Sequence, residues 1–246
     1  MRGTLIREPR KSKKKFDADR DAFLAVVSHE LRNQITAIHW WAELMKRSAP
    51  DGEMLARGLK VIERNANLQT QLIEQLIDLS RVRINCMEPK AQKTSLVPIL
   101  EIAFDSMMPL ASAKGIEMAS RLEDSEQTVN ADAGLLQQAI TNILANAIKF
   151  TPAGGRIDLR FVTRGTWAEI TVNDTGCGIP RELVHLIFDP FKQAHTNHTN
   201  NNGLGLGLTI AHHIIAIHNG TICANSPGEG KGTTFVVTLP LESSQY

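Results

Sequence analysis

Apolar residues in the first third of the chain recur every three or four positions, and this spacing constrains the fold more than any other feature. Such a period places the residues on one face of an α-helix. The segment Ala49-Pro50-Asp51-Gly52 interrupts the pattern, so we expect two helices joined by a tight turn. The first stripe consists of Leu24, Val27, Leu31, Ile38, Ala42 and Met45, and the second of Leu55, Leu59, Ile62, Ala66, Ile73 and Leu76, widened by Leu68, Leu72, Leu79 and Val82.

One hairpin of this kind cannot cover its own apolar stripes. Two helices shield only part of each other's surface, whereas four helices enclose a common core. We therefore expect residues 17–85 of two copies to pair as a four-helix bundle, which makes the protein a homodimer.

Residues 1–16 precede the helical pattern and are rich in lysine and arginine. Such a segment is either a solvated linker or a connector from a sensor domain. The formal net charge of the 246-residue chain is only +1, so no overall field attracts nucleic acid, and no nucleic-acid partner is expected.

We expect no membrane segment, because the uninterrupted apolar runs are far shorter than the roughly 20 residues of a membrane helix. No apolar stretch follows the basic N-terminus, as a secretory signal requires. Cys86, Cys177 and Cys223 have no paired spacing, which is typical of reduced thiols and not of a disulfide framework or a zinc site. These features predict a cytoplasmic protein.

Beyond residue 92 the pattern becomes a mixture of helices and strands. Helices are expected at 96–113 and 133–150, with Asp132 as the N-cap of the second. Alternation of apolar and polar residues predicts four strands, at 156–162, 167–172, 221–224 and 233–239. This order predicts an α+β sandwich over residues 92–242, with one sheet covered by helices on one face.

His29 lies in the segment SHELRN of the first expected helix. At about 100° per residue it points roughly 140–180° away from the apolar stripe, toward solvent. Glu30 beside it could accept the Nδ1–H and raise the nucleophilicity of Nε2. Asn33, one turn further on, could hold a water or a phosphoryl oxygen. The alternative is an ordinary surface histidine.

Asn142, Asn146 and Lys149 share one face of the helix expected at 133–150. Amide oxygens are hard ligands and lysine supplies a point charge, a combination that suits a metal ion and phosphates. The alternative is an ordinary polar outer face.

Asp174 follows the second expected strand and opens the segment Asp-Thr-Gly-Cys-Gly. Its carboxylate could accept a hydrogen bond from an exocyclic amino group such as that of adenine. Gly176 and Gly178 would let the backbone approach a bound base closely. The same pattern also occurs in ordinary turns.

Gly203, Gly205 and Gly207 lead into an apolar helix that is expected to run to about His218. The N-terminus of such a helix offers free N–H groups and a positive dipole end to phosphates, and the glycines allow a lid to move. A dinucleotide-binding βαβ unit is excluded, because no strand precedes the glycines.

In this order, these segments resemble the sensor histidine kinases of two-component systems, from about Phe23 to Pro240. FLAVVSHELRN resembles the H-box of their dimerisation and histidine-phosphotransfer domain. The N-box, the two glycine boxes and the F-box of the gyrase, Hsp90 and MutL superfamily are matched by NILANAIKFT, NDTGCGIP, GLGLGL and IFDPFKQ. The nucleotide boxes fit any ATPase of that superfamily, whereas the H-box is specific to the kinases.

The resemblance implies that His29 accepts the γ-phosphoryl group of ATP, with Glu30 as its acid/base partner, and passes it to an aspartate of a response regulator receiver domain. Asn33 falls where family members with phosphatase activity toward the regulator carry Thr or Asn.

For the ATP-binding domain, the resemblance implies that Asn146 ligates Mg²⁺, that Asn142 and Lys149 contact phosphates, and that Asp174 reads adenine. It also implies that Phe188 and Phe191 pack at the root of the lid, a role compatible with plain core packing.

The sequence departs from the family pattern at two places. Gln34 stands where the family usually has proline, and the lid HTNHTNNN has no Lys or Arg between Lys192 and Gly203. His195 and His198 in this lid are either metal ligands or solvated residues. These departures leave open a second class of function, a non-catalytic ATP-binding clamp or dimerising scaffold.

Overall fold

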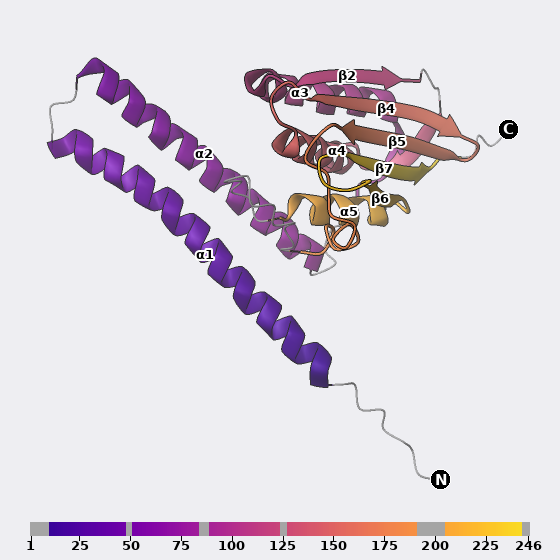
Figure 1. Ribbon diagram of the computed structural model, residues 1–246. Coiled ribbons are helices and arrows are strands. Elements are labelled where there is room, and N and C mark those ends of the chain that lie inside the picture. Colours follow the sequence, from indigo (N-terminus) through magenta and orange to yellow (C-terminus); the bar gives the residue numbers. More distant parts are fainter. Residues whose placement is uncertain (1–9, 48–50, 84–88, 124–126, 191–204, 243–246) are drawn as a thin grey trace, which may run out of the picture. The chain divides into compact units, whose positions relative to one another are not determined.

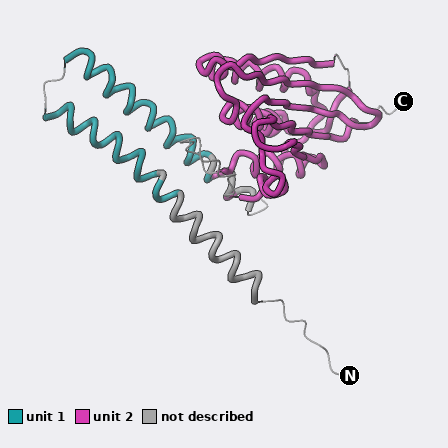
Figure 2. Tube along the Cα trace, viewed as in Figure 1, with its two compact units in different colours: residues 1–76 teal, residues 77–246 magenta. Residues whose placement is uncertain are grey.

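The computed structural model describes residues 10–47, 51–83, 89–123, 127–190 and 205–242. In the first helix, side chains are described from Val27 onward, that of Glu30 excepted. The chain divides into two compact units, residues 1–76 and 77–246, which Figure 2 draws in teal and magenta. The boundary falls inside the second helix.

The first unit contains two long antiparallel helices, α1 (Arg10–Arg47) and α2 (Gly52–Arg83), as the sequence predicts (Figure 1). Asp51 caps α2, because its Oδ1 accepts the N–H of Met54 at 2.7 Å. Gly58 lets the helices approach closely, since a Cβ there would lie 2.8 Å from the ring of Trp41. The absence of a side chain at Gly58 therefore makes room for a large aromatic ring.

The first helix begins at Arg10, whereas the apolar periodicity places its start at Asp17. The added residues are rich in lysine and arginine, which have high helix propensity. A helix can therefore extend here although no apolar stripe marks it.

The hairpin buries only part of its apolar surface. Val27 and Leu72 are buried, and most of the remaining stripe residues are half-buried or exposed. Its exposed large apolar side chains include Ile35, Trp40, Leu55, Leu59 and Ile73. An apolar surface of this kind is what a second helical pair covers in a four-helix bundle.

The second unit is built on a five-stranded sheet in the order β2-β4-β5-β7-β6. β2 and β4 pair in parallel and the other neighbours are antiparallel. The strands are β2 (Glu117–Leu122), β4 (Arg156–Arg164), β5 (Trp167–Asp174), β6 (Thr221–Asn225) and β7 (Thr233–Pro240). The last four are the strands predicted from alternation, and each ends one or two residues later than predicted.

The expectation of a single sheet is wrong. A second, two-stranded antiparallel sheet joins β1 (Gln92–Ser95) to β3 (Thr128–Ala131). These strands and β2 were not predicted. β1 and β3 have only four residues each, too few for alternation to stand out, and β2 has adjacent half-buried residues at Met118 and Ala119.

Three helices cover one face of the large sheet, α3 (Leu96–Lys114), α4 (Ala133–Phe150) and α5 (Gly207–Ile217) (Figure 1). The predicted helices at 96–113 and 133–150 are confirmed. Asp132 is the N-cap of α4, as predicted, and its Oδ1 accepts the N–H of Leu135 at 3.1 Å. The core lies between the helices and the inward side chains of the strands, among them Leu159, Ile170 and Phe235.

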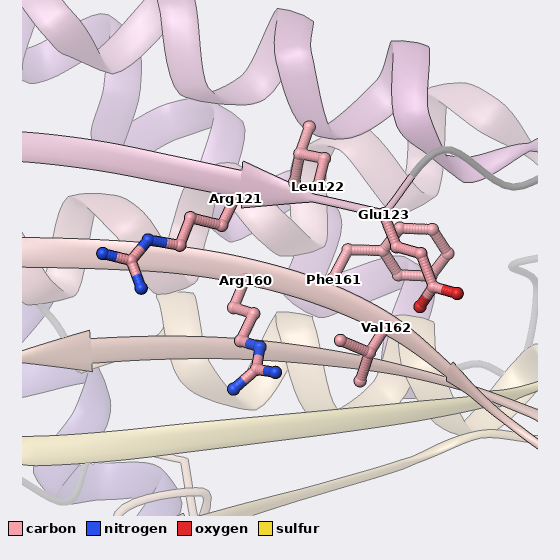
Figure 3. A pocket seen from close by; sticks show the side chains of 6 residues that line it. All are labelled: Arg121, Leu122, Glu123, Arg160, Phe161 and Val162. Carbon is pink, nitrogen blue, oxygen red and sulfur yellow. The ribbon is translucent and has the colours of Figure 1, made fainter.

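The opposite face of the sheet carries polar and charged side chains. Arg121 on β2 and Arg160 on β4 are register partners, and so are the next residues, Leu122 and Phe161. Figure 3 shows the two arginines pointing away from the helices, while Leu122 and Phe161 point toward them. The alternation of the strands thus separates a solvated face from the core face.

Of the described helices, α3 alone is long and apolar enough to cross a membrane. Its buried residues contribute to the core of the second unit, where α3 contacts α4 and β2: Leu96, Ile99, Leu100, Ala103, Phe104 and Ala111. A buried helix of a folded domain has this same composition.

Candidate functional site

His29 is exposed on α1, as the sequence predicts. The amide Nδ2 of Asn33 lies 3.1 Å from its Nδ1. When this amide donates, Nδ1 is the acceptor and the proton of a neutral ring is on Nε2. With the amide turned over, Oδ1 accepts an Nδ1–H and Nε2 keeps its lone pair. Asn33 is therefore placed to hold either tautomer, and the side chain of Glu30 lies outside the described residues.

Gln34 is buried in the hairpin, with 6% of its surface exposed, and α1 is continuous through it. Its Oε1 has no hydrogen-bond partner among the described residues. A buried acceptor without a donor costs free energy, and none of the described residues compensates this cost at Gln34 in the helix that carries His29.

The polar face of α4 carries Asn142, Asn146 and Lys149, all half-buried. Neither asparagine side chain has a hydrogen-bond partner in the part of the chain that the structure describes, so both amides are available to a ligand. The ammonium of Lys149 lies 5.1 Å from the centroid of the Phe150 ring, and burial lowers the pKa of Lys149.

The described residues contain no group of three or more His, Cys, Asp or Glu side chains that could hold a metal ion. Mg²⁺ often needs only one or two protein ligands, because substrate phosphates and waters complete its shell. An amide without a partner among the described residues, such as that of Asn146, fits this kind of site, in which a nucleotide supplies further oxygens.

Asp174 ends β5 and is buried, with 5% of its surface exposed. Its Oδ1 accepts the N–H groups of Gly176 at 2.8 Å and Thr233 at 3.2 Å. Its Oδ2 accepts no hydrogen bond from a described residue and is therefore open to an amino group. Burial raises the pKa of Asp174, and the two backbone hydrogen bonds only partly oppose this effect.

The loop after Asp174 needs its two glycines for different reasons. A Cβ at Gly176 would lie 2.7 Å from both Asp174 Oδ1 and the carbonyl oxygen of Phe150. Gly178 has φ +69°, and a Cβ there would overlap the carbonyl oxygen of Gly228. Both positions therefore exclude larger residues, which keeps the backbone at Gly176 close to the end of α4 and the backbone at Gly178 close to the loop at Gly228.

The second glycine segment is described from Gly205 onward, and Gly203 lies outside the described residues. Gly205 has φ +68°, and α5 begins at Gly207. A Cβ at Gly207 would lie 3.8 Å from the side chain of Asn142. The N-terminus of α5, with its free N–H groups and positive dipole end, thus lies beside the polar face of α4.

Phe188 is half-buried, and its ring centroid lies 5.5 Å from that of His212 and 6.5 Å from that of Phe235. Its carbonyl accepts the hydroxyl of Thr209 in the first turn of α5, at 3.0 Å. Phe188 therefore joins the core to the start of α5. Phe191 and the segment HTNHTNNN lie outside the described residues.

Three residues that the sequence analysis did not single out, Thr233, Ser226 and Lys114, make hydrogen bonds between segments of the site that are distant in sequence. Thr233 donates its N–H to Asp174, as described above. The hydroxyl of Ser226 accepts the N–H of Ile179 at 2.9 Å and donates to the carbonyl of Gly232 at 2.8 Å. Lys114 donates to the last carbonyls of α4. The motif GKGTT, which contains Thr233, was the available signal for the first of these residues.

Comparison with known proteins agrees with this geometry. Residues 19–83 match the His Kinase A (phospho-acceptor) domain family. Residues 131–243 match the family of histidine kinase-, DNA gyrase B- and HSP90-like ATPases. Both His29 and the residues on α4, β5 and α5 lie inside these matches.

Similar proteins include the sensor histidine kinase WalK of Bacillus subtilis, 31% identical over 94% of this chain and 38% of its own length. The sensor histidine kinase RcsC of Escherichia coli is 32% identical over 98% of this chain and 25% of its own length. The solved structure of full-length ShkA in complex with AMPPNP is 26% identical, with a TM-score of 0.67, over 90% of this chain and 46% of that one.

The chain thus spans less than half the length of these relatives. It nevertheless contains both domains. The phospho-acceptor domain, with His29, precedes the ATPase domain, with the residues on α4, β5 and α5. This chain belongs to the sensor histidine kinases of two-component systems.

Proposed function

We propose that this protein transfers the γ-phosphoryl group of ATP to His29, and from there to an aspartate of a response regulator receiver domain. The observation that carries the proposal is the pairing, in one chain, of an exposed histidine held by Asn33 with a domain whose Asp174 loop and α5 N-terminus both adjoin α4. The first unit supplies the acceptor of the phosphoryl group, and the second unit supplies the site for the nucleotide that donates it.

In the proposed complex, adenine donates its amino group to Oδ2 of Asp174, and the phosphates lie at Lys149 and the N-terminus of α5. The polar face of α4 connects these two ends. ShkA, which was solved with the nucleotide analogue AMPPNP, supports an adenine nucleotide in this domain. Mg²⁺ held by Asn146 and the phosphates would neutralise charge on the transferred group.

At His29, the lone pair of Nε2 attacks the γ-phosphorus, a nitrogen–phosphorus bond forms, and the bond to the β-phosphate oxygen breaks to release ADP. This step needs the tautomer with a proton on Nδ1, and the turned amide of Asn33 would hold it. Phosphorylation at Nε2 leaves the ring positively charged, and Glu30 is proposed as the base that takes the proton from Nδ1, while Asn33 only orients the ring.

The exposed apolar residues of α1 and α2 support a homodimer in which two hairpins form the bundle. ATP and reduced thiols are both available in the cytoplasm, so we place the reaction there. The free cysteines Cys177 and Cys223 agree with that compartment.

The test is to incubate the protein with γ-labelled ATP and Mg²⁺. A kinase acquires label that is stable in alkali and lost in acid, as phosphohistidine is, and passes it to a receiver domain. Binding of ATP without any covalent label would instead identify an ATP-binding scaffold and overturn the proposal.

A further inference from the structure

The last turn of α4 is capped by residues from distant parts of the chain. The final four carbonyl groups of an α-helix have no partner inside the helix. In α4 the carbonyl of Ala147 accepts the N–H of Thr151 at 3.0 Å, and that of Phe150 accepts the N–H of Cys177 at 3.1 Å. The remaining two belong to Ile148 and Lys149.

Both remaining carbonyls accept from one side chain, that of Lys114 in the last turn of α3. Its Nζ lies 2.6 Å from the carbonyl oxygen of Ile148 and 2.7 Å from that of Lys149. A cation at this end of a helix also opposes the negative end of the helix dipole. Lys114 therefore satisfies half of the free carbonyls of α4 with charge-assisted hydrogen bonds.

The turn after α4 is tied to α3 at a second point. Gly115, the C-cap of α3, has φ +71°, and its carbonyl accepts the N–H of Gly154 at 2.8 Å. The end of α3 thus holds both the last turn of α4 and the turn that follows it.

This junction lies between the two parts of the nucleotide site. On one side, α4 carries Asn146 and Lys149 in its last two turns. On the other, the hydrogen bond from Cys177 to Phe150 fixes the loop that begins at Asp174. A shift of the last turn of α4 would change the spacing between the phosphate-binding side chains and the adenine-binding carboxylate.

We propose that Lys114 is a positioning residue for nucleotide binding, which keeps the phosphate-binding face of α4 in register with the Asp174 loop. The inference rests on the proposed function of the second unit as an ATP-binding domain. In this role Lys114 acts through the backbone of α4, to which it donates two hydrogen bonds.

The test compares the affinities of the whole protein for adenosine and for Mg-ATP. Adenosine engages only the Asp174 loop, whereas ATP needs both parts in register. Lys114→Met should weaken ATP binding about three- to ten-fold, less than the loss of a direct charge-assisted hydrogen bond to the nucleotide because Lys114 acts through the backbone of α4, and leave adenosine binding nearly unchanged. Lys114→Arg, which keeps a cationic donor, should restore most of the ATP affinity.

Lys93→Met is the matched control, because it removes an exposed lysine on β1 and should change neither affinity. If Lys114→Met does not fold, as judged by circular dichroism, Lys114→Gln should show the same selective loss to a smaller extent. Equal weakening of adenosine and ATP, or no weakening in a folded variant, would overturn the positioning role alone. Failure of the wild type to bind ATP would overturn the proposed function as well.

Discussion

At the scale of single residues, Asp174 combines burial with an uneven use of its two carboxylate oxygens. Both backbone donors, from Gly176 and Thr233, bind Oδ1. Oδ2 accepts no hydrogen bond from a described residue, and we propose that it accepts the amino group of adenine. Because burial raises the pKa of Asp174, its charged form is less favoured than that of a solvated aspartate.

We predict that adenine nucleotide affinity falls on acidification, starting at a higher pH than an ordinary aspartate would require. The ionised carboxylate is the form that accepts the amino group, so protonation removes the contact, and a raised pKa moves this loss upward in pH. Asp174→Asn should weaken binding by ~1.5–3 kcal/mol at neutral pH. The affinity for adenine nucleotide, measured by calorimetry at a series of pH values, should therefore fall with decreasing pH for the wild type. A wild-type profile as flat as that of Asp174→Asn would contradict the assignment.

Asn33 lies within hydrogen-bonding distance of the ring of His29, and we propose that it acts in the removal of phosphate as well as in its acceptance. We predict that Asn33→Ala slows dephosphorylation of the phosphorylated regulator, because its amide is placed to orient an attacking water. Autophosphorylation should persist at a reduced rate, since Asn33 also helps to set the tautomer. The measurement is the decay of labelled receiver domain, with Thr36→Ala on the same helix as a control. Equal decay with wild type and Asn33→Ala would exclude the role.

Sequence reasoning identifies residues that lie within one motif and fails for those that meet across the fold. Asn142, Asn146 and Lys149 share a helix face by spacing alone. Lys114 could not be found this way, because it meets the carbonyls of α4 only after the helix layer has formed, and for Thr233 the motif GKGTT marks the segment but not its hydrogen-bond partner. The hydrogen bond from the N–H of Thr233 to Oδ1 of Asp174, for example, joins the start of β7 to the end of β5.

At the scale of elements, α1 is a continuous helix through the position where the family has proline. The N–H of Gln34 is available to the helix, whereas a proline there would remove it and push the helix into a kink. The backbone hydrogen bond kept at Gln34 stabilises α1. The burial of Oε1, which has no partner among the described residues, offsets part of this stabilisation.

We predict opposite effects of two substitutions at this position. Gln34→Met removes an unsatisfied buried acceptor at similar volume and should raise the free energy of unfolding by about 1 kcal/mol. Gln34→Pro should lower it by about 3 kcal/mol. Urea denaturation followed by circular dichroism measures both. Destabilisation by Gln34→Met would mean that the buried amide has a partner in the assembled protein.

The elements that could be predicted are those with a strong local signal. α4 was placed at residues 133–150 because Asp132 marks its start and a turn segment its end. The strands β4 and β5 alternate cleanly over most of their length. β2 could not be predicted from alternation, because the adjacent residues Met118 and Ala119 are both half-buried and interrupt the pattern.

At the scale of the whole molecule, the proposed dimer depends on the apolar surface that one hairpin leaves exposed. Leu55, Leu59 and Ile73 belong to one predicted stripe of α2, and all three are exposed in a single chain. Leu59 is 53% exposed, and so is Leu110 on α3 of the other unit. The two leucines therefore form a matched pair for mutation.

We predict that Leu59→Asp shifts the protein from dimer to monomer, whereas Leu110→Asp leaves it dimeric. Two half-exposed leucines are lost per dimer, and because the interface can bury only the exposed half of each, they contribute together about 1.5–3 kcal/mol, so the dimer dissociation constant should rise at least about tenfold. Size-exclusion chromatography with light scattering over a range of concentrations measures the change. A dimer that survives Leu59→Asp would place the interface elsewhere.

The central claim is that His29 accepts the phosphoryl group, and its most direct test compares the wild type with His29→Gln. Both proteins are incubated with γ-labelled ATP and Mg²⁺, and their nucleotide affinities are measured in parallel. The account predicts acid-labile, alkali-stable label on the wild type and none on His29→Gln, with nearly equal ATP affinity, because the exposed ring of His29 belongs to the other unit. The same label persisting on His29→Gln would contradict the claim.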